Sequence, residues 1–256
     1  MEPPLAMVLL KHPAKPSLEK LQEAIRANWE DVPPVEEAPV SLPPDVDLPP
    51  FQAMRMGDTV AFILSEAEPI PEEDLEPACL SAWYWPDAQK AVKEHTAHLV
   101  VILPEPPQDP LERYIILTQI TAALAQITDS VAVFWPRALL VHKPEDFINS
   151  ARQMGPGQFP LELWVGFHGE VDEDQTLTLF TRGMAAFSLP EIEVYNTRQQ
   201  PQFVYERVYN IAYYLLENGP VIHDGETVGM NEDERYKVRI GPSRLEPRIR
   251  ALQVEM

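Results

Sequence analysis

Apolar residues recur along this chain at two spacings, and the two spacings predict a mixture of strands and helices. In the first half, short apolar runs predict four strands, at residues 5–10, 40–42, 59–65 and 98–103, of which the second lies between prolines and is expected at an edge. The first predicted helix begins at Ser17, whose hydroxyl suits a helix start, and has its apolar stripe at Leu18, Leu21, Ile25 and Trp29. A shorter helix is predicted at residues 87–95. The first half therefore has the predicted order βαββαβ.

The second half repeats this order. Helices are predicted at residues 110–127, 144–153 and 203–217, the first with Asp109 or Pro110 at its start and the last ended by Gly219. Strands are predicted at residues 131–135, 161–167, 176–181, 236–240 and 251–254. The repeated order indicates an α+β fold of two ferredoxin-like modules, joined by the helix at 110–127 and either separate or sharing one sheet.

Proline marks the expected boundaries, because it lacks the backbone N–H and fixes φ. Residues 1–107 contain 18 of the 28 prolines, and the clusters Pro33–Pro50, Pro69–Pro77 and Pro104–Pro110 are predicted to be loops. The last cluster is the expected join between an N-terminal module, residues 1–107, and a C-terminal module, residues 108–256. The two modules could also pack as one compact unit.

The charge changes the expected partners. The chain has 20 basic and 40 acidic residues, a net charge of −20, which repels nucleic acid and anionic membranes and leaves either solubility or a basic protein partner as its role. No apolar segment approaches the length of a membrane span, and residues 5–10 are too short for a signal peptide. The single cysteine, Cys79, indicates a reduced, cytoplasmic protein.

Metal and cofactor motifs are not found in the sequence. His95 and His98 are separated by the end of a helix and the start of a strand, and His168 with Glu170 precedes an acidic turn that lacks the ligand order of a calcium loop. Acidic neighbours should raise the pKa of Cys79, so this thiol is not expected to be a nucleophile. No metal and no cofactor are therefore predicted.

The aromatic run “SAWYWPDA” has two interpretations. Trp83 and Trp85 would share one face of an extended segment and Tyr84 the other, which suits an interaction surface. Such a run also suits the core where a loop enters a helix. Oligomeric state stays open.

The segment “TRGMAAFSLPEIEV”, residues 181–194, combines Arg182 with two carboxylates, Glu191 and Glu193. With His168 or Asp224 these groups could form an acid–base site if they met in a cleft. The alternative is a packed bend in which Gly183 adopts a positive φ.

Four strings of the C-terminal region carry a family resemblance: “LELWVGF”, “TLFTRGMAAFSLPEIEV”, “VYNIAYYLLENGPVIHDGETVG” and “DERYKVRIGPS”. This region, residues 161–254, resembles the bacterial family known as domain of unknown function 4261. The upstream strings “AWYWPDA”, “AHLVV” and “LVHKPEDF” look like the region that accompanies that domain. The resemblance implies no activity, cofactor or catalytic residue, only shared positions: Trp164, Thr181, Gly183, Glu191, Glu193, Asn210, Gly219, Asp224, Gly225 and Gly229.

Two functions follow from these observations. The first is a non-enzymatic, protein-binding factor of the immunity, adaptor or chaperone kind, soluble and acidic. The second is an enzyme with a carboxylate-based site around Arg182, Glu191 and Glu193. The first is the prediction, and the second is its alternative.

Overall fold

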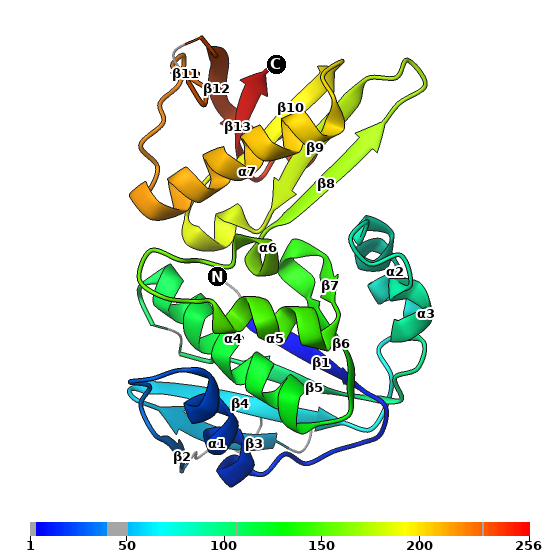
Figure 1. The fold of residues 1–256 in the computed structure, drawn as a ribbon, viewed down its shortest axis with the longest axis vertical. Coiled ribbons are helices and arrows are strands. Elements are labelled where there is room, and N and C mark those ends of the chain that lie inside the picture. Colours follow the sequence, from blue (N-terminus) through cyan, green and yellow to red (C-terminus); the bar gives the residue numbers. More distant parts are fainter. Residues whose placement is uncertain (1–3, 40–50, 106, 232) are drawn as a thin grey trace. The chain divides into compact units, whose positions relative to one another are not determined.

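The computed structural model describes residues 4–39, 51–105, 107–231 and 233–256, and the chain forms two compact units. Unit 1 is Met1–Leu163 and unit 2 is Trp164–Met256. Each unit has its own helices and its own β-sheet, in which some neighbouring strands are not consecutive in the sequence (Figure 1). The prediction of an α+β fold is therefore confirmed.

Unit 1 is built on a seven-stranded sheet with the order β2-β3-β4-β5-β1-β6-β7, in which every neighbouring pair is antiparallel. Its strands are β1 (Leu5–Leu10), β2 (Val35–Glu37), β3 (Phe51–Met56), β4 (Thr59–Glu66), β5 (Ala97–Ile102), β6 (Ser130–Trp135) and β7 (Leu140–His142). The continuous apolar runs that predicted β1, β4, β5 and β6 reflect a sheet that is buried on both faces.

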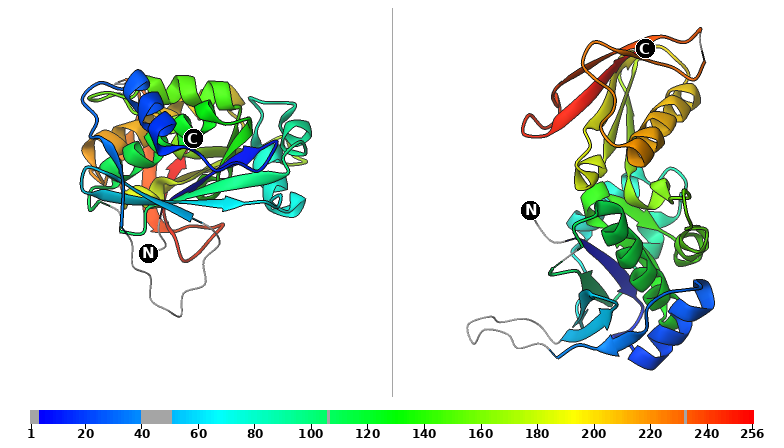
Figure 2. Two further views of the ribbon diagram at one scale, coloured as in Figure 1. Left: turned by 90° about the horizontal axis from the view of Figure 1, so that it is seen from below. Right: turned by 90° about the vertical axis from the view of Figure 1, so that its left-hand side faces the viewer.

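Helices cover both faces of this sheet (Figures 1 and 2). They are α1 (Leu18–Asn28), α2 (Glu72–Ser81), α3 (Ala88–Val92), α4 (Pro110–Ile127) and α5 (Pro144–Arg152), with a short 3-10 helix, η1 (Pro136–Ala138), after β6. On one face the Trp135 ring packs against Tyr114 of α4 and Phe147 of α5. On the other face, Leu9 and Phe134 join the apolar side chains of α2 and α3 in one cluster. Alternate residues of β1 and β6 therefore point into two different cores.

Helix starts agree with the sequence signals. Ser17 Oγ accepts from Lys20 N at 3.5 Å at the start of α1, and Asp109 Oδ1 accepts from Leu111 N at 2.9 Å at the start of α4. Most of α4 is buried, which explains its strongly apolar sequence.

The strand pairing differs from two ferredoxin-like modules. In a split β-α-β arrangement, two strands joined by a helix are parallel and enclose a third strand. Within residues 1–107, β4 and β5 are joined by helices but pair directly and antiparallel. The enclosing pair is instead β5 and β6, joined by α4, with β1 between them. The helix at 110–127 is thus a crossover within one sheet, and the expected division between residues 107 and 108 falls inside unit 1.

Three local predictions also need correction or comment. The cluster Pro69–Pro77 was expected to be a loop, yet α2 runs through Pro77, because a proline removes only one hydrogen bond while Leu75 and Ala78 are buried on either side of it. Residues 161–167 were expected to form a strand, but Leu161–Trp164 form a helical turn, α6, and the strand begins only afterwards. The strand expected at residues 40–42 lies outside the described residues.

Unit 2 is a six-stranded sheet with the order β11-β12-β13-β10-β9-β8. Its elements are β8 (Gly166–Val171), β9 (Leu177–Arg182), the 3-10 helix η2 (Met184–Phe187), β10 (Glu191–Thr197), α7 (Pro201–Asn218), β11 (Thr227–Val228), β12 (Tyr236–Pro242) and β13 (Arg250–Glu255). Only β10 and β13 are parallel, and they join two antiparallel groups of strands.

Helix α7 lies along one face of this sheet (Figure 2, right). Its buried residues are Val204, Val208, Ala212, Leu215 and Leu216, and Tyr205 and Tyr209 contact the Phe167 ring of β8. The helix ends at Gly219, whose φ of +77° confirms the predicted stop. Across the described residues, no helix is long and apolar enough to cross a membrane.

His142, at the end of β7, generates a prediction about acid stability. Burial lowers the pKa of this imidazole to about 3, from an ordinary value of 6.5, and its ring stacks on Tyr84 with a centroid separation of 5.7 Å. Its Nε2 is buried without a hydrogen-bond partner. The unfolded chain therefore takes up a proton as the pH falls below 6.5, whereas the folded chain takes it up only near pH 3.

We expect the free energy of unfolding to fall by about 2–3 kcal/mol between pH 6.5 and 4.5 through this group alone. The His142→Phe variant keeps an aromatic ring in place and should lose this part of the acid sensitivity. Urea unfolding across the pH range measures it, and the two proteins should show the same slope above pH 7. An equal loss of stability in wild type and variant would rule out His142 as the cause.

Candidate functional site

The bend between β9 and β10 is organised by the buried carboxylate of Glu191. Its oxygens accept hydrogen bonds from the Thr181 hydroxyl at 2.7 Å and from the backbone N–H groups of Gly183, Met184 and Ala185 at 3.0, 3.3 and 3.0 Å. These N–H groups lie at the start of η2, where a helix has no partners of its own for them. The carboxylate therefore caps the 3-10 helix, where its negative charge also suits the helix end.

The hydrogen-bond directions fit the ionised form of Glu191. Thr181 Oγ1 accepts from Ile192 N at 2.8 Å, so its own proton points to Glu191. Both carboxylate oxygens thus act as acceptors. Burial raises the pKa of this carboxyl, while the four hydrogen bonds act in the opposite direction. A group held in this way is committed to the bend and is not available to a substrate.

Gly183 is required at this bend. Its φ is +121°, and a Cβ at this position would lie 2.4 Å from the carbonyl oxygen of Trp164. Only glycine combines this backbone conformation with so close an approach of a second chain segment. The expected positive φ is confirmed.

Glu193 is buried in a different environment. Ser243 Oγ donates to Glu193 Oε1, and Arg244 N donates to Glu193 Oε2 at 3.4 Å. The same serine oxygen accepts from Leu245 N at 3.1 Å and Glu246 N at 3.0 Å. Ser243 therefore fixes the loop between β12 and β13, and its saturated, buried hydroxyl does not have the access of a nucleophile.

The neighbouring Tyr195 extends this polar group. Burial, followed by the nearby Glu193 carboxylate, raises the pKa of its hydroxyl, and the Arg244 guanidinium lies 4.6 Å from the centroid of its ring. These residues border a surface concavity of about 530 Å³ that also includes Arg239 and Glu255. Within this lining Arg239 and Glu255 form an ion pair at 2.8 Å.

His168 and Arg182 meet at a third place, around Phe180. The His168 ring stacks on Phe180 with centroids 5.4 Å apart, and the Arg182 guanidinium lies 5.9 Å from the same ring. His168 is directly opposite Phe180 in the β8–β9 pair, and Phe180 is opposite Glu193 in the β9–β10 pair. Phe180 therefore stands between His168 and Glu193 on one face of the sheet.

Asp224 belongs to a turn. Its Oδ1 accepts from Ile240 N at 2.9 Å, and the following Gly225 has a φ of +82°, as the Asp-Gly pair predicted. The five residues of the alternative catalytic site thus have four separate roles: Glu191 caps η2, Glu193 holds the 243–244 loop, His168 and Arg182 pack on Phe180, and Asp224 anchors a turn to β12.

The aromatic run divides between core and surface. Trp85 is 6% exposed and belongs to the core cluster, whereas Trp83 is 65% exposed. Tyr84 donates its hydroxyl proton to Val141 O at 2.9 Å. Trp83 and Trp85 do not share a face, because the segment between α2 and α3 is a turn and is not extended.

The histidine and cysteine considered from the sequence have structural environments. His95 Nε2 accepts from Ile70 N at 2.9 Å, and its Nδ1 contacts Val92 O. Burial, and then Glu72 and Glu76, raises the pKa of Cys79 in the predicted direction. Within the described residues, no three metal-ligating side chains are grouped so that they could hold an ion.

Sequence reasoning missed a concavity of about 520 Å³ beside α7. Three of its lining residues are among the most exposed large apolar side chains of the described chain: Tyr214 at 50%, Val221 at 43% and Met230 at 52%. We call this site the Tyr214 concavity. The sequence did contain a signal for this site. On the side of α7 away from its buried residues, the helical spacing places four lining residues together: Arg207, Asn210, Ile211 and Tyr214.

Hydrogen bonds attach the rim of the Tyr214 concavity to α7. Glu234 accepts from Arg207 of α7 at 2.6 Å and from Met230 N at 3.2 Å, and Arg207 lies over the Phe203 ring at 3.8 Å. A Cβ on Gly229 would lie 2.0 Å from Glu234 O. The described residues of this loop, 229–231 and 233–234, are thus packed tightly on one another and tied to the helix.

The capping role of Glu191 predicts a large effect of a small change. The Glu191→Gln variant keeps the side-chain shape but turns an N–H₂ group toward backbone donors, so we expect a loss of about 2–4 kcal/mol in the free energy of unfolding at neutral pH. Urea unfolding followed by far-UV circular dichroism and by total tryptophan fluorescence measures this loss. The matched control is Glu170→Gln, an exposed carboxyl on β8 that should change little. If Glu191→Gln were as stable as the control, the carboxyl would not be a structural cap.

Comparison with protein families assigns the second unit. Residues 180–255 match the family model described as Domain of unknown function (DUF4261). The match covers η2, with its Glu191 cap, and the Tyr214 concavity. No curated protein and no solved structure matches the chain. Residues 180–255 of this chain are therefore similar to the DUF4261 family.

Proposed function

We propose that this protein is a non-enzymatic binding factor that takes an apolar side chain of a basic protein partner into the Tyr214 concavity. The observation that carries this proposal is the grouping of Tyr214, Val221 and Met230 around one hollow of about 520 Å³. Scattered exposed apolar residues are ordinary on protein surfaces, but a contiguous group marks an interaction site. A concave group also suits the anchor residues that dominate binding energies.

The charges around the hollow favour a basic segment. Arg207 is the cation of the lining, and it is paired with Glu234 at 2.6 Å and with Glu206 at 3.3 Å. Glu226 adds an exposed carboxylate to the same lining. Together with the net charge of −20, these groups attract positively charged partners and repel nucleic acid.

The alternative of carboxylate-based catalysis is less well supported. A general acid or base must reach a proton of the substrate. Glu191 and Glu193 are both buried, and their hydrogen bonds go to the protein itself. Binding is therefore the function that we favour for unit 2.

A second apolar surface in unit 1 is a candidate for the same function. Leu80, in the last turn of α2, is 74% exposed, and Trp83, just after α2, is 65% exposed; the first turn of this helix contains Glu72, Glu73 and Asp74. This surface is a second place where a basic, apolar partner could bind. We rank it below the Tyr214 concavity, because the latter is hollow and lies within the family match. The single cysteine supports a cytoplasmic location for such binding.

Selection from a displayed library of random peptides tests the proposal with the whole protein. We expect the selected peptides to share an apolar anchor next to Lys or Arg, and to bind more weakly as salt is raised. Tyr214→Ser and Met230→Ser should each weaken the best peptide by about tenfold or more, since anchor contacts contribute about 1–2 kcal/mol or more.

Two controls separate the surfaces. Leu245→Ser changes a comparably exposed apolar residue, 47% exposed, outside the concavity and should leave the affinity unchanged. Trp83→Ser reports on the surface in unit 1. Loss of binding in Trp83→Ser with none in Tyr214→Ser would transfer the function to unit 1. Peptides without basic residues, or equal effects of all four substitutions, would contradict the proposal.

A further inference from the structure

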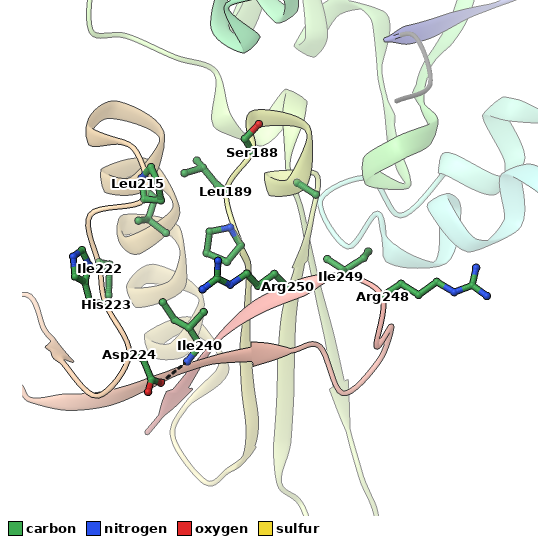
Figure 3. A pocket seen from close by; sticks show the side chains of 13 residues that line it. Ser188, Leu189, Leu215, Ile222, His223, Asp224, Ile240, Arg248, Ile249 and Arg250 are labelled. Carbon is green, nitrogen blue, oxygen red and sulfur yellow. Dashed lines mark hydrogen bonds between the residues drawn. The ribbon is translucent and has the colours of Figure 1, made fainter.

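Unit 2 has a further hollow, of about 670 Å³, beside the chain segment that follows α7 (Figure 3). Its lining comes from four places: the stretch before β10, helix α7, the segment after α7, and the strands β12 and β13 with the loop between them. The residues are Ala185, Ser188, Leu189 and Pro190, then Leu215, then Pro220, Ile222, His223 and Asp224, and finally Ile240, Arg248, Ile249 and Arg250. We call it the Arg250 concavity. Of its lining residues, Ile222 also borders the Tyr214 concavity.

The floor of the Arg250 concavity is apolar. Leu189 and Leu215 are buried, and Ile222, Ile240 and Ile249 are half-buried. Ligand sites in proteins have this composition, mainly apolar with a few polar groups that fix the orientation of the ligand, and volumes of about 300–1,000 Å³. The hollow is therefore of the size and kind that holds a small molecule.

Arg250 supplies the polar group. In Figure 3 its side chain extends from the start of β13 toward the segment with Ile222 and His223, whereas Arg248 extends away from the other lining residues. Among the described residues, no carboxylate lies within ion-pair distance of the Arg250 guanidinium, in contrast to Arg207 with Glu234 and Arg239 with Glu255. Arg250 thus presents an unmatched positive charge over an apolar floor.

The acidic residue of the lining, Asp224, is held in a turn. Asp224 Oδ1 accepts from Ile240 N at 2.9 Å, and Figure 3 places Asp224 at the edge of the hollow, beyond Ile240. His223 lies beside Ile222 on the same wall, and its imidazole offers a ligand a hydrogen-bonding group in addition to the Arg250 guanidinium. In a chain of net charge −20, a hollow with Arg250 and His223 selects for negative charge locally.

We propose that the Arg250 concavity binds a small amphipathic anion, with a carboxylate or phosphate on the Arg250 guanidinium and an apolar body against Leu189, Leu215 and Ile240. A guanidinium group binds a carboxylate or a phosphate through two parallel hydrogen bonds, so both head groups offer it two acceptor oxygens. The apolar body contributes through burial of its surface on the floor.

Calorimetric titration of the whole protein with octanoate, octyl phosphate, octanol and octylammonium tests this site. We expect saturable binding of octanoate or octyl phosphate, and the tighter of the two identifies the head group. Octanol should bind at least about tenfold more weakly, because it lacks the charge-assisted hydrogen bonds. Inorganic phosphate alone should bind weakly, because it lacks the apolar body.

Arg250→Gln should weaken the anion by about tenfold or more, and Arg250→Lys, which keeps the charge but loses the two-pronged contact, should weaken it less. Arg248→Gln is the matched control, since it removes the same charge two residues away from a side chain that points elsewhere. Thermal unfolding confirms that each variant is folded. No saturable binding to wild type, octylammonium binding as tightly as octanoate, or equal losses in Arg248→Gln and Arg250→Gln would each overturn the proposal.

Discussion

The structure of unit 2 depends on the need to satisfy backbone N–H groups inside a buried bend. Three such groups, those of Gly183, Met184 and Ala185, lie at the start of η2, and Glu191 accepts from all of them together with the Thr181 hydroxyl. The carboxylate is on β10, whereas its donors are at the end of β9 and on η2. One side chain therefore joins two strands and the turn between them. Since β10 also pairs with β13, the capped bend lies next to the only parallel pair of the sheet.

The same constraint explains why this segment resembles an active site in sequence. Arginine, glycine and two glutamates within a short stretch suit a catalytic loop, but they also meet the needs of a buried bend. A buried carboxylate is stable only when its lone pairs are occupied, and here the protein occupies them. Glu193 follows the same rule with Ser243 and Arg244 N. The polar character of the segment is thus a property of its burial.

Features set by neighbouring residues could be predicted, and features set by distant residues could not. Ser17, Asp109 and Gly219 marked helix ends through local chemistry, and α1, α4 and α7 lie close to where the sequence placed them. Strand pairing joins residues far apart, so no periodicity could reveal that β1 lies between β5 and β6. Pro77 shows that a local signal can also mislead. Proline disfavours a helix, but α2 forms across Pro77 because the burial of Leu75 outweighs this preference.

In the candidate site, too, features set by neighbouring residues were predictable and features set by distant residues were not. The positive φ of Gly183 and the turn at Asp224 and Gly225 were predictable from residue type. The partner of Glu193 is 50 residues away, at Ser243, and only the fold brings the two together. The Tyr214 concavity depends on Val221 and Met230, which follow the helix in an irregular segment without a recognisable period.

The Tyr214 and Arg250 concavities of unit 2 share one wall. Ile222 lines both of them, and the segment around it runs from the end of α7 to the turn at Asp224, where the bond to Ile240 N attaches it to β12. His223 N donates to Glu226 Oε2 at 2.7 Å, which ties the Arg250 side of this wall to a residue of the Tyr214 concavity. Two ligands that contact opposite sides of one segment act on the same backbone positions. When each ligand binds more tightly to one position of that segment than to another, the first ligand changes the binding free energy of the second. The second ligand then changes the binding free energy of the first by the same amount.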